Sequence, residues 1–403
     1  MTWRYEDGGP RRLQTSPGGL GLTDGAELEV TTRIAPAVTM VVHDLDASAL
    51  LLRHSAGEGA TALVERVDPV SLEPVAQSPE LPAGPVWPGG LGVGDDGSVI
   101  VVFGDHAHRL DSALRVQARR RLPRQLPYNS FVPLPGGAIA TKDFAGSRPG
   151  VPVPAEDRRP SELVVMEPDQ LEILDRLVIP EPSIARLSAD GGDIYVVGDT
   201  SLLRVRWDGE RLQLDEGFRV RYRLQEGQTY GWDCVVAAGA AWFLDNGEGT
   251  DAYSGTLRGH GVSSEPLHLV RVDLVTGELA MAEVCGLPRG LVANPPVVDA
   301  RRQVVVGYDS GNGVVTGFDL DTLEVRWQRS QDHGSHLLLY EDTGELVTGD
   351  GNDVVVLDVT SGAELARADS GLGMQSVLFP APGRGRDFYL CSFLALSHVT
   401  VHS

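Results

Sequence analysis

Lysine is almost absent from this chain of 403 residues. Only one of its 34 basic residues, Lys142, is a lysine, and all the others are arginine. A guanidinium keeps its proton at any physiological pH, whereas a buried ammonium can lose it. A position that needs a titratable amine cannot accept arginine, so Lys142 is the first candidate for a chemical role. Chance survival of a single lysine is the competing interpretation.

Long apolar runs and paired cysteines are also missing. No run of apolar residues approaches the ~18 that would span a bilayer, and the acidic first seven residues lack the apolar core of a secretory signal. Cys234, Cys285 and Cys391 are far apart and form no CxxC pair, which is typical of reduced thiols. We therefore expect a cytoplasmic protein.

Positive charge is in deficit, because 34 basic residues face 56 acidic ones and give a net charge of −22. Such a surface repels phosphate backbones and anionic headgroups. We therefore expect no nucleic-acid partner and no membrane partner. The expected partner is a small organic molecule, and the expected state is a monomer or a simple homo-oligomer.

Glycine (48) and proline (26) are abundant and separate many short apolar strands. Residues 344–366 contain an apolar strand, an Asp/Gly turn, a second strand ending in Asp, a Thr-Ser-Gly turn and a third strand. Residues 303–327 repeat this order, and residues 267–279 repeat its second half. A regular repeat of this kind predicts an array of small β-sheets.

The repeated hairpin has the form apolar-x-Asp-x-x-Thr-Gly-x-x-x-Trp, and it resembles that of the PQQ-like repeat propellers. Asp319 to Trp327 is the best match, with Leu323 at the glycine position, and Thr276-Gly277 is kept in another copy that lacks the tryptophan. That superfamily includes quinoprotein dehydrogenases and non-catalytic scaffolds. The resemblance therefore implies a fold and leaves the function open.

We predict an all-β fold, a single β-propeller domain over residues 1–403 with eight four-stranded blades; seven blades are the alternative. The innermost strands are expected to begin near Thr39, Trp87, Tyr128, Ser183, Tyr230, Asn294, His336 and Gln375. Only three strands follow residue 375, so the early strand Glu27–Ile34 is expected to join the last blade and close the ring. Closure removes exposed sheet edges.

Second strands end repeatedly in aspartate. The six residues are Asp105, Asp143, Asp199, Asp245, Asp309 and Asp350. A carboxylate at one register in six blades favours a structural role, with Asp accepting backbone N–H groups in turns. As a ring they would also make the channel mouth negative. No cofactor and no metal ligands are predicted, but a divalent metal at this acidic mouth is left open.

The residues just before the inner strands are aromatic or polar, and they converge on the central channel. The predicted substrate-binding residues are Trp87, Tyr128, Asn129, Tyr230, Trp232, Asn294 and Gln375, together with His106. Aromatic residues at these positions also serve as packing between blades. The histidine pairs 106/108 and 333/336 match no closed zinc spacing.

Two insertions, residues 144–161 and 246–265, follow second strands and are expected to overhang the central opening. Loops longer than about 12–15 residues in a compact domain are usually functional or disordered. The first comes directly after Lys142-Asp143, and the second directly after Asp245. Together they indicate a covered site on one face of the ring.

These features favour an enzyme that acts on a small organic molecule by acid–base or electrostatic catalysis, of the lyase, hydrolase or cyclase type. The predicted catalytic residues are Lys142, Asp143, Asp233, Asp245 and His336. The alternative is a non-catalytic ligand-binding or protein-interaction propeller. A PQQ-dependent dehydrogenase is less favoured, because the chain lacks adjacent cysteines and the full set of repeat tryptophans.

Overall fold

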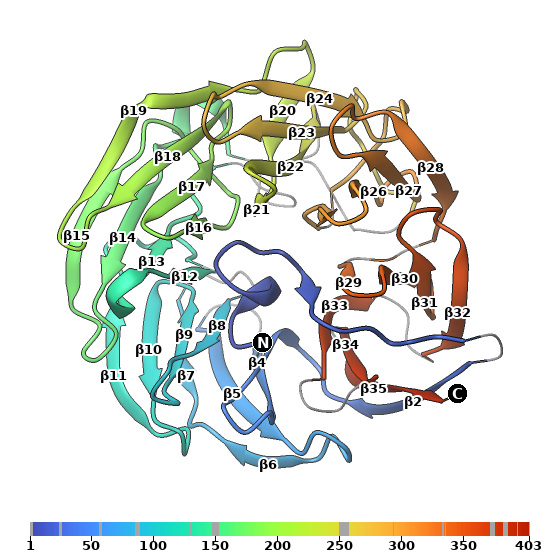
Figure 1. Ribbon diagram of the computed structural model, residues 1–403. Coiled ribbons are helices and arrows are strands. Elements are labelled where there is room, and N and C mark those ends of the chain that lie inside the picture. The colour runs from blue at the N-terminus through green and yellow to red at the C-terminus, as the bar shows by residue number, and fades with distance from the viewer. Residues whose placement is uncertain are drawn as a thin grey trace.

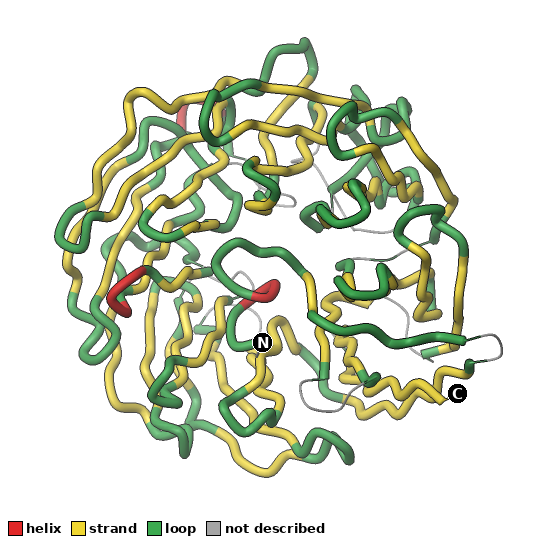
Figure 2. The backbone as a smooth tube through the Cα atoms, in the orientation of Figure 1, coloured by secondary structure: helices red, strands yellow, loops and turns green. Residues whose placement is uncertain are grey.

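The computed structural model describes residues 3–23, 26–55, 59–84, 89–128, 130–146, 153–249, 258–292, 294–332, 334, 336–370, 375–381, 386–392 and 394–402. Within these residues the chain forms eight four-stranded blades around a central axis (Figure 1). The eight-bladed prediction is confirmed. Each blade is antiparallel and starts at the axis (Figure 2). Turns and connections therefore alternate between the two faces of the disc.

In each of the first four blades the strands follow one another from the axis outward. Blade 1 is β3 (Val38–His43), β4 (Ala49–His54), β5 (Thr61–Val67) and β6 (Pro74–Gln77), with β7 (Leu81–Pro82) also paired to β5. Blade 2 is β8 (Gly90–Val93), β9 (Val99–Phe103), β10 (His106–Leu110) and β11 (Val116–Arg121). Blade 3 is β12 (Phe131–Pro133), β13 (Ile139–Lys142), β14 (Glu162–Met166) and β15 (Ile173–Val178). Blade 4 is β16 (Ser188–Asp190), β17 (Asp193–Val197), β18 (Ser201–Trp207) and β19 (Leu212–Arg221).

The other four blades have the same arrangement. Blade 5 has β20 (Gln228–Gly231) and β21 (Val235–Ala237) innermost, then β22 (Ala240–Gly247), β23 (His268–Asp273) and β24 (Leu279–Glu283). Blade 6 is β25 (Val297–Asp299), β26 (Val304–Asp309), β27 (Val314–Asp319) and β28 (Val325–Ser330). Blade 7 is β29 (Leu338–Tyr340), β30 (Glu345–Asp350), β31 (Asp353–Asp358) and β32 (Glu364–Asp369). Blade 8 is β33 (Gln375–Pro380), β34 (Phe388–Ser392), β35 (Ala395–His402) and, outermost, β2 (Glu27–Ile34).

The ring is closed by β2, which pairs along its whole length with β35 in antiparallel register. Three short 3-10 turns complete the described elements: η1 (Glu6–Gly8), η2 (Pro135–Gly137) and η3 (Ala155–Asp157). Among the described residues, no helix is long and apolar enough to cross a membrane.

The hydrophobic core lies between neighbouring blades. Middle strands such as β9 are buried at every position because a blade covers each of their faces, whereas the outer strand β11 is largely exposed. Trp327, the tryptophan of the repeat, is 8% exposed and donates its indole N–H to the carbonyl of Val359 in the next blade, at 2.9 Å. It therefore packs between blades, as the repeat implies.

The N-terminal residues cross the central opening, an arrangement that the sequence patterns do not predict (Figure 1). We call residues 3–16 the axial strap. Its carbonyl groups accept hydrogen bonds from the inner strands of blades 1, 2, 4, 5 and 7; the donors are the N–H groups of His43, Val93, Ala189, Val236 and Leu339. It ends as β1 (Thr15–Ser16), which pairs in parallel with β29.

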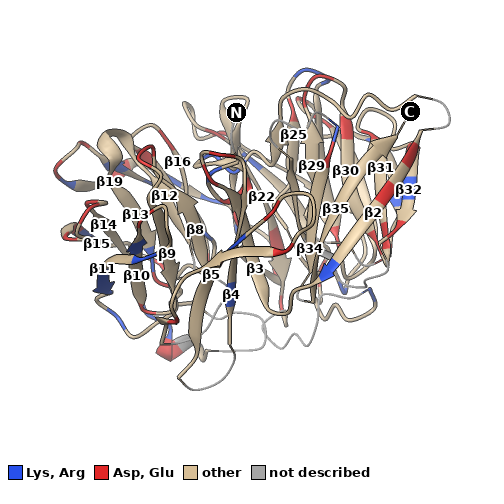
Figure 3. Cartoon of the chain, turned by 90° about the horizontal axis from the view of Figure 1, so that it is seen from below, with Lys and Arg blue, Asp and Glu red and all other residues tan. Residues whose placement is uncertain are grey.

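The strap lies on the face where first strands turn into second strands. It reaches the ends of the inner strands, and Arg4 contacts Asp95 in the β8–β9 turn at 2.7 Å. The connections that lead into the inner strands, and the turns from second to third strands, lie on the opposite face because the strands alternate in direction. Figure 3 shows the N-terminal end on one face of the disc.

Candidate functional site

Lys142 is the last residue of β13 and is 2% exposed. Its ammonium donates hydrogen bonds to the backbone carbonyls of Asp143 (2.9 Å) and Ser183 (3.0 Å) and lies 4.6 Å from the ring centre of Phe144. No carboxylate of the described residues lies within ion-pair distance of it. Burial lowers the pKa of Lys142 to about 7, although the charges of Asp143, Asp233 and Asp199 oppose this effect.

An aromatic cluster adjoins this amine. Phe144, Ile184 and Tyr230 are buried together, and the partly buried Trp232 packs against them. Phe144 starts the first insertion, and the other three precede or begin the inner strands of blades 4 and 5. The structure therefore brings the predicted residues Tyr230 and Trp232 into one cluster with Phe144, whose ring lies beside the Lys142 ammonium.

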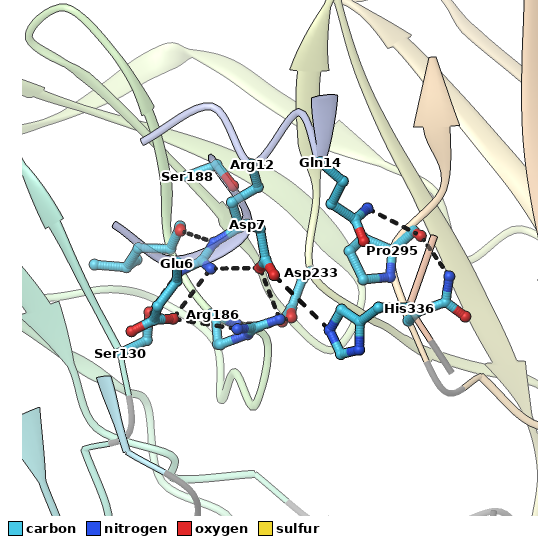
Figure 4. A network of polar contacts seen from close by, with 12 residues as sticks. Glu6, Asp7, Arg12, Gln14, Ser130, Arg186, Ser188, Asp233, Pro295 and His336 are labelled. Carbon is cyan, nitrogen blue, oxygen red and sulfur yellow. Dashed lines mark hydrogen bonds and ion pairs between the residues drawn. The ribbon is translucent and has the colours of Figure 1, made fainter. Parts of the chain in front are cut away.

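A buried ionic network joins the strap to residues that lead into the inner strands of blades 4 and 5 (Figure 4). Arg186, just before β16, donates to both carboxylate oxygens of Asp233, each at 2.6 Å, from its backbone N–H and from Nε. Its two terminal nitrogens contact Glu6 (3.1 Å) and Asp7 (2.9 Å) of the strap. One guanidinium thus holds carboxylates from two distant parts of the chain.

Arg12 of the strap completes the network and is 1% exposed. It contacts Glu6 (3.2 Å) and Asp7 (2.9 Å), and it donates to the carbonyl of Leu187 (2.6 Å) and to the hydroxyl of Ser130. Within this network the carboxylates of Glu6, Asp7 and Asp233 face the guanidiniums of Arg12 and Arg186.

Strap carboxylates Glu6 and Asp7 differ in acidity. Burial raises the pKa of Glu6, and the nearby guanidiniums of Arg12 and Arg186 do not outweigh it. Burial would also raise the pKa of Asp7, but the charges of Arg186 and Arg12 overcome it and hold the pKa at about 2. Asp7 is therefore the stable anion of the pair.

His336 precedes the inner strand of blade 7 and lies at the edge of the network. Its Nε2 is 3.8 Å from Oδ1 of Asp7, and its side chain is 14% exposed. In Figure 4 the imidazole points toward the Asp7 carboxylate. The predicted residues His336 and Asp233 are thus joined through Asp7 and Arg186.

Asp143 is fully buried, and its carboxylate oxygens bind donors other than the Lys142 amine. One oxygen accepts the N–H of Glu162 (3.1 Å), and the other accepts Nη1 of Arg124 (2.8 Å). Burial raises the pKa of Asp143. Its direct contact with Lys142 is through its backbone carbonyl, so it acts on the lysine mainly as a nearby charge.

Asp245 is fully buried inside blade 5. It accepts the backbone N–H of His268 (2.6 Å), lies 3.0 Å from Nδ1 of the same imidazole, and accepts the side-chain N–H of Gln228. Burial raises its pKa. None of its contacts among the described residues joins it to Lys142.

Three of the predicted substrate-binding residues, Tyr128, His106 and Asn294, belong neither to the aromatic cluster nor to the ionic network. Tyr128 is fully buried in the core between blades 2 and 3. His106, on the third strand of blade 2, lies 2.7 Å from Oδ1 of Asp105 and 3.0 Å from the carbonyl of Ala83. Asn294 is fully buried and donates to the carbonyl of Pro295 at 2.9 Å. Both Trp87 and Asn129, as well as His333, lie outside the described residues, and only the backbone of Gln375 is described.

Four of the repeated aspartates, Asp143, Asp245, Asp309 and Asp350, accept backbone N–H groups, which fits the structural interpretation for these four. Asp309 accepts the backbone N–H groups of Leu291 and Asn312, each at 3.1 Å, and Asp350 accepts that of Asp332 at 2.6 Å. Each therefore ties the end of a second strand to the chain that leads into the same blade, and Asp309 also holds its own turn. Among the described residues, no group of three or more His, Cys, Asp or Glu side chains could hold a metal ion.

Sequence reasoning missed Glu6, Asp7, Arg12 and Arg186. A signal was present, because two acids and two arginines flank a Gly-Gly-Pro turn within residues 6–12. Paired opposite charges in so short a segment are suited to a folded ionic cluster. The partners of this segment in the ring, Ser130, Arg186 and Leu187, are however more than a hundred residues away in the sequence.

No protein-family model matches the chain, and no curated protein matches it. Solved structures do. BamB from Moraxella catarrhalis superposes with a TM-score of 0.62 at 13% identity, over 92% of this chain and 100% of that one. A quinohemoprotein alcohol dehydrogenase from Comamonas testosteroni gives 0.65 at 11% identity, over 99% and 80%. Sqt1 from Saccharomyces cerevisiae gives 0.62 at 10% identity, over 93% and 98%.

The chain is therefore an eight-bladed β-propeller. Within that class it has the fold of the PQQ-like repeat propellers, and the resemblance noted in the sequence is confirmed at this level. Identities of 10–13% establish the fold alone. The similar structures include an alcohol dehydrogenase and proteins whose names state no reaction, so the function has to be argued from the site.

Proposed function

We propose that this propeller is an enzyme that acts on a small organic molecule, with Lys142 as its acid–base group. The reaction would be of the lyase, hydrolase or cyclase type, because these need proton transfer and charge stabilisation without a redox group. The substrate would bind on the face opposite the strap, against Tyr230 and Trp232.

The observation that carries this proposal is the environment of the one lysine. An ammonium that is 2% exposed, hydrogen-bonded to two carbonyls and without an ion pair among the described residues is costly to keep charged. Its pKa of about 7 is where a group exchanges protons most effectively at neutral pH. A scaffold has no need for an amine in this state.

His336 is the second proposed proton-transfer group. It is partly exposed and lies beside Asp7, which the two arginines keep anionic. A histidine oriented by a buried carboxylate is a common arrangement for a base. Asp233 would act on Lys142 as a nearby charge, since both of its oxygens are already held by Arg186.

A non-catalytic ligand-binding or protein-interaction propeller is the second candidate. The observation that favours it is that Asp233, Asp143 and Arg186 are all engaged in internal contacts and present no free charge to a substrate. Such saturated groups are typical of structural networks. A binding propeller would use only the aromatic cluster and the mouth.

The enzyme needs the Lys142 amine to exchange a proton, whereas the binding propeller does not. The test uses the wild-type protein, Lys142→Arg and Lys142→Met, incubated with a panel of small organic acids, esters and lactones and followed by mass spectrometry. If the protein is an enzyme of this kind, both variants should turn over a wild-type substrate with a kcat/KM at least about 100-fold lower. The wild-type pH–rate profile should also have a limb near the lysine pKa of about 7.

The pH–rate limb should be absent from any residual activity of Lys142→Arg, because a guanidinium does not titrate there. Wild-type turnover by Lys142→Arg would contradict the proposal. Compounds that bind both wild type and Lys142→Met, and that neither protein converts, would favour the binding propeller.

A further inference from the structure

A groove of about 640 Å³ lies beside the described parts of the first insertion. Its walls include Leu126, Phe144 and Val153, which are apolar, and Arg124, Asp157 and Arg159, which are charged. The volume is in the range of small-molecule sites. Because Arg124 precedes β12 and Phe144 follows β13, the groove opens on the face opposite the strap.

The two arginines that line this groove differ in whether they already have partners among the described residues. Arg124 is held by Asp143 at 2.8 Å and by the carbonyl of Pro160 at 2.7 Å. Arg159 is exposed, and no carboxylate of the described residues lies within ion-pair distance of it. The chain has a net charge of −22, and its described arginines commonly pair with acids. Arg159 has no such partner among the described residues and lies beside an apolar wall, so its guanidinium is available to a ligand.

The apolar wall connects this groove to Lys142. Phe144 is 4% exposed and is one of the residues lining the groove, and its ring centre lies 4.6 Å from the Lys142 ammonium. Phe144 therefore contacts both the groove and the surroundings of the amine. A molecule bound in this groove needs an apolar body for Leu126, Phe144 and Val153, and an anionic group for Arg159.

We propose that this groove binds a small organic carboxylate, with its apolar part on Phe144 and its carboxylate paired with Arg159. This assignment goes beyond the proposed function, because it requires binding and no participation of Lys142 in chemistry. Asp157 is the one carboxylate among the described residues lining the groove, and it opposes the ligand's charge. Removing the negative charge of Asp157 should therefore strengthen the binding of an anionic ligand, which is the opposite of the effect expected for Arg159.

The experiment uses two probes of nearly equal shape, phenylacetate and its neutral amide phenylacetamide, titrated calorimetrically into the full chain. The variants are Arg159→Gln and Asp157→Asn. The matched control is Arg211→Gln: Arg211 is also exposed but lies in the β18–β19 turn, on the strap face. A partly exposed charge pair makes about a tenfold difference in affinity.

We expect phenylacetate to bind about tenfold more tightly than phenylacetamide. Arg159→Gln should abolish the difference, Asp157→Asn should increase it, and Arg211→Gln should leave it unchanged. Lysine labelled with ¹³C reports on one position in this chain, and its signal should shift when phenylacetate binds, because the ligand displaces the Phe144 ring.

Equal affinities for the two probes would overturn the proposal, as would no binding of phenylacetate at millimolar concentration. If Arg211→Gln reduced the affinity difference between the two probes as much as Arg159→Gln does, the attraction would be non-specific, and this result would also overturn the proposal. Lys142→Met tests the two proposals separately: it should keep phenylacetate binding even though it removes the proposed acid–base group.

Discussion

Replacing Lys142 by methionine should change how the stability of the protein depends on pH. Methionine is unbranched and similar in length, and it carries no charge. A lysine pKa of about 7 in place of the ordinary 10.5 corresponds to about 5 kcal/mol, at about 1.36 kcal/mol per pKa unit. This is the free energy by which the fold disfavours the charged amine relative to the unfolded chain.

The sign follows from which state binds more protons. Between pH 7 and 10.5 the unfolded chain keeps the lysine proton and the folded protein releases it, so wild-type stability rises with pH by up to about 1.4 kcal/mol per unit. Below pH 7 both states are protonated and the full destabilisation remains. Lys142→Met lacks this dependence.

At pH 6 the methionine variant should therefore be at least as stable as wild type, although it loses the two hydrogen bonds to the carbonyls of Asp143 and Ser183. Near pH 10 wild type should be the more stable of the two. Above pH 7 Lys142→Arg should be less stable than both, because its charge cannot be released.

The assay is urea unfolding followed by tryptophan fluorescence from pH 6 to 10 for the three proteins. Other titrating groups contribute equally to wild type and Lys142→Met, so the difference between their curves isolates the lysine. The ¹³C signal of labelled Lys142 gives its folded pKa directly. A midpoint near 10, together with parallel stability curves, would refute the reasoning.

Four further changes test the strap and the repeat. Asp7→Asn leaves Arg12 and Arg186 short of a buried partner and should cost about 3–5 kcal/mol in thermal unfolding. Glu6→Gln should cost clearly less in the same measurement, because burial already favours its neutral form. Trp327→Phe loses the bond to the Val359 carbonyl and should cost about 1–2 kcal/mol in urea unfolding. Deleting residues 1–16 should lower the melting temperature while circular dichroism keeps its β-sheet signal, because β2 still pairs with β35.

The blades could be predicted from the sequence because their determinants are local. An apolar strand, an Asp or Gly turn and a second strand lie within a short stretch of chain, and the turn aspartates act within their own blade or on the adjoining connection. Asp309 is an example, since both of its backbone donors lie within 18 residues. The inner strands begin near the predicted positions for the same reason, as at residue 375.

The site was predicted only in part, because pocket and packing residues share one pattern. Tyr128 and Tyr230 both precede or begin inner strands, yet one fills the core between blades 2 and 3 and the other joins the cluster beside Lys142. Which role each takes depends on the neighbouring blade. Asp143 and Asp245 have the expected positions, but Arg124 and His268 take up their carboxylates.

The strap could not be found by such rules, because its partners are distant. Arg12 contacts Leu187 and Ser130, which are 175 and 118 residues away. No periodicity links these positions, since the strap has no regular structure beyond η1 and the two-residue strand β1. Only the three-dimensional ring brings them together.

The axial network also explains how the centre of so large a ring is held. Five inner strands (β12, β16, β21, β25 and β29) have only three residues each, so little apolar surface meets at the axis. Charged contacts act there instead: Arg186 joins blade 4 to Asp233 of blade 5 and to the strap, and the strap reaches His336 before blade 7. Because these contacts are directional, they fix the orientation of Asp233 and His336 as well as the spacing of the blades. The groups that hold the ring together are thus those that would set the geometry of the reaction.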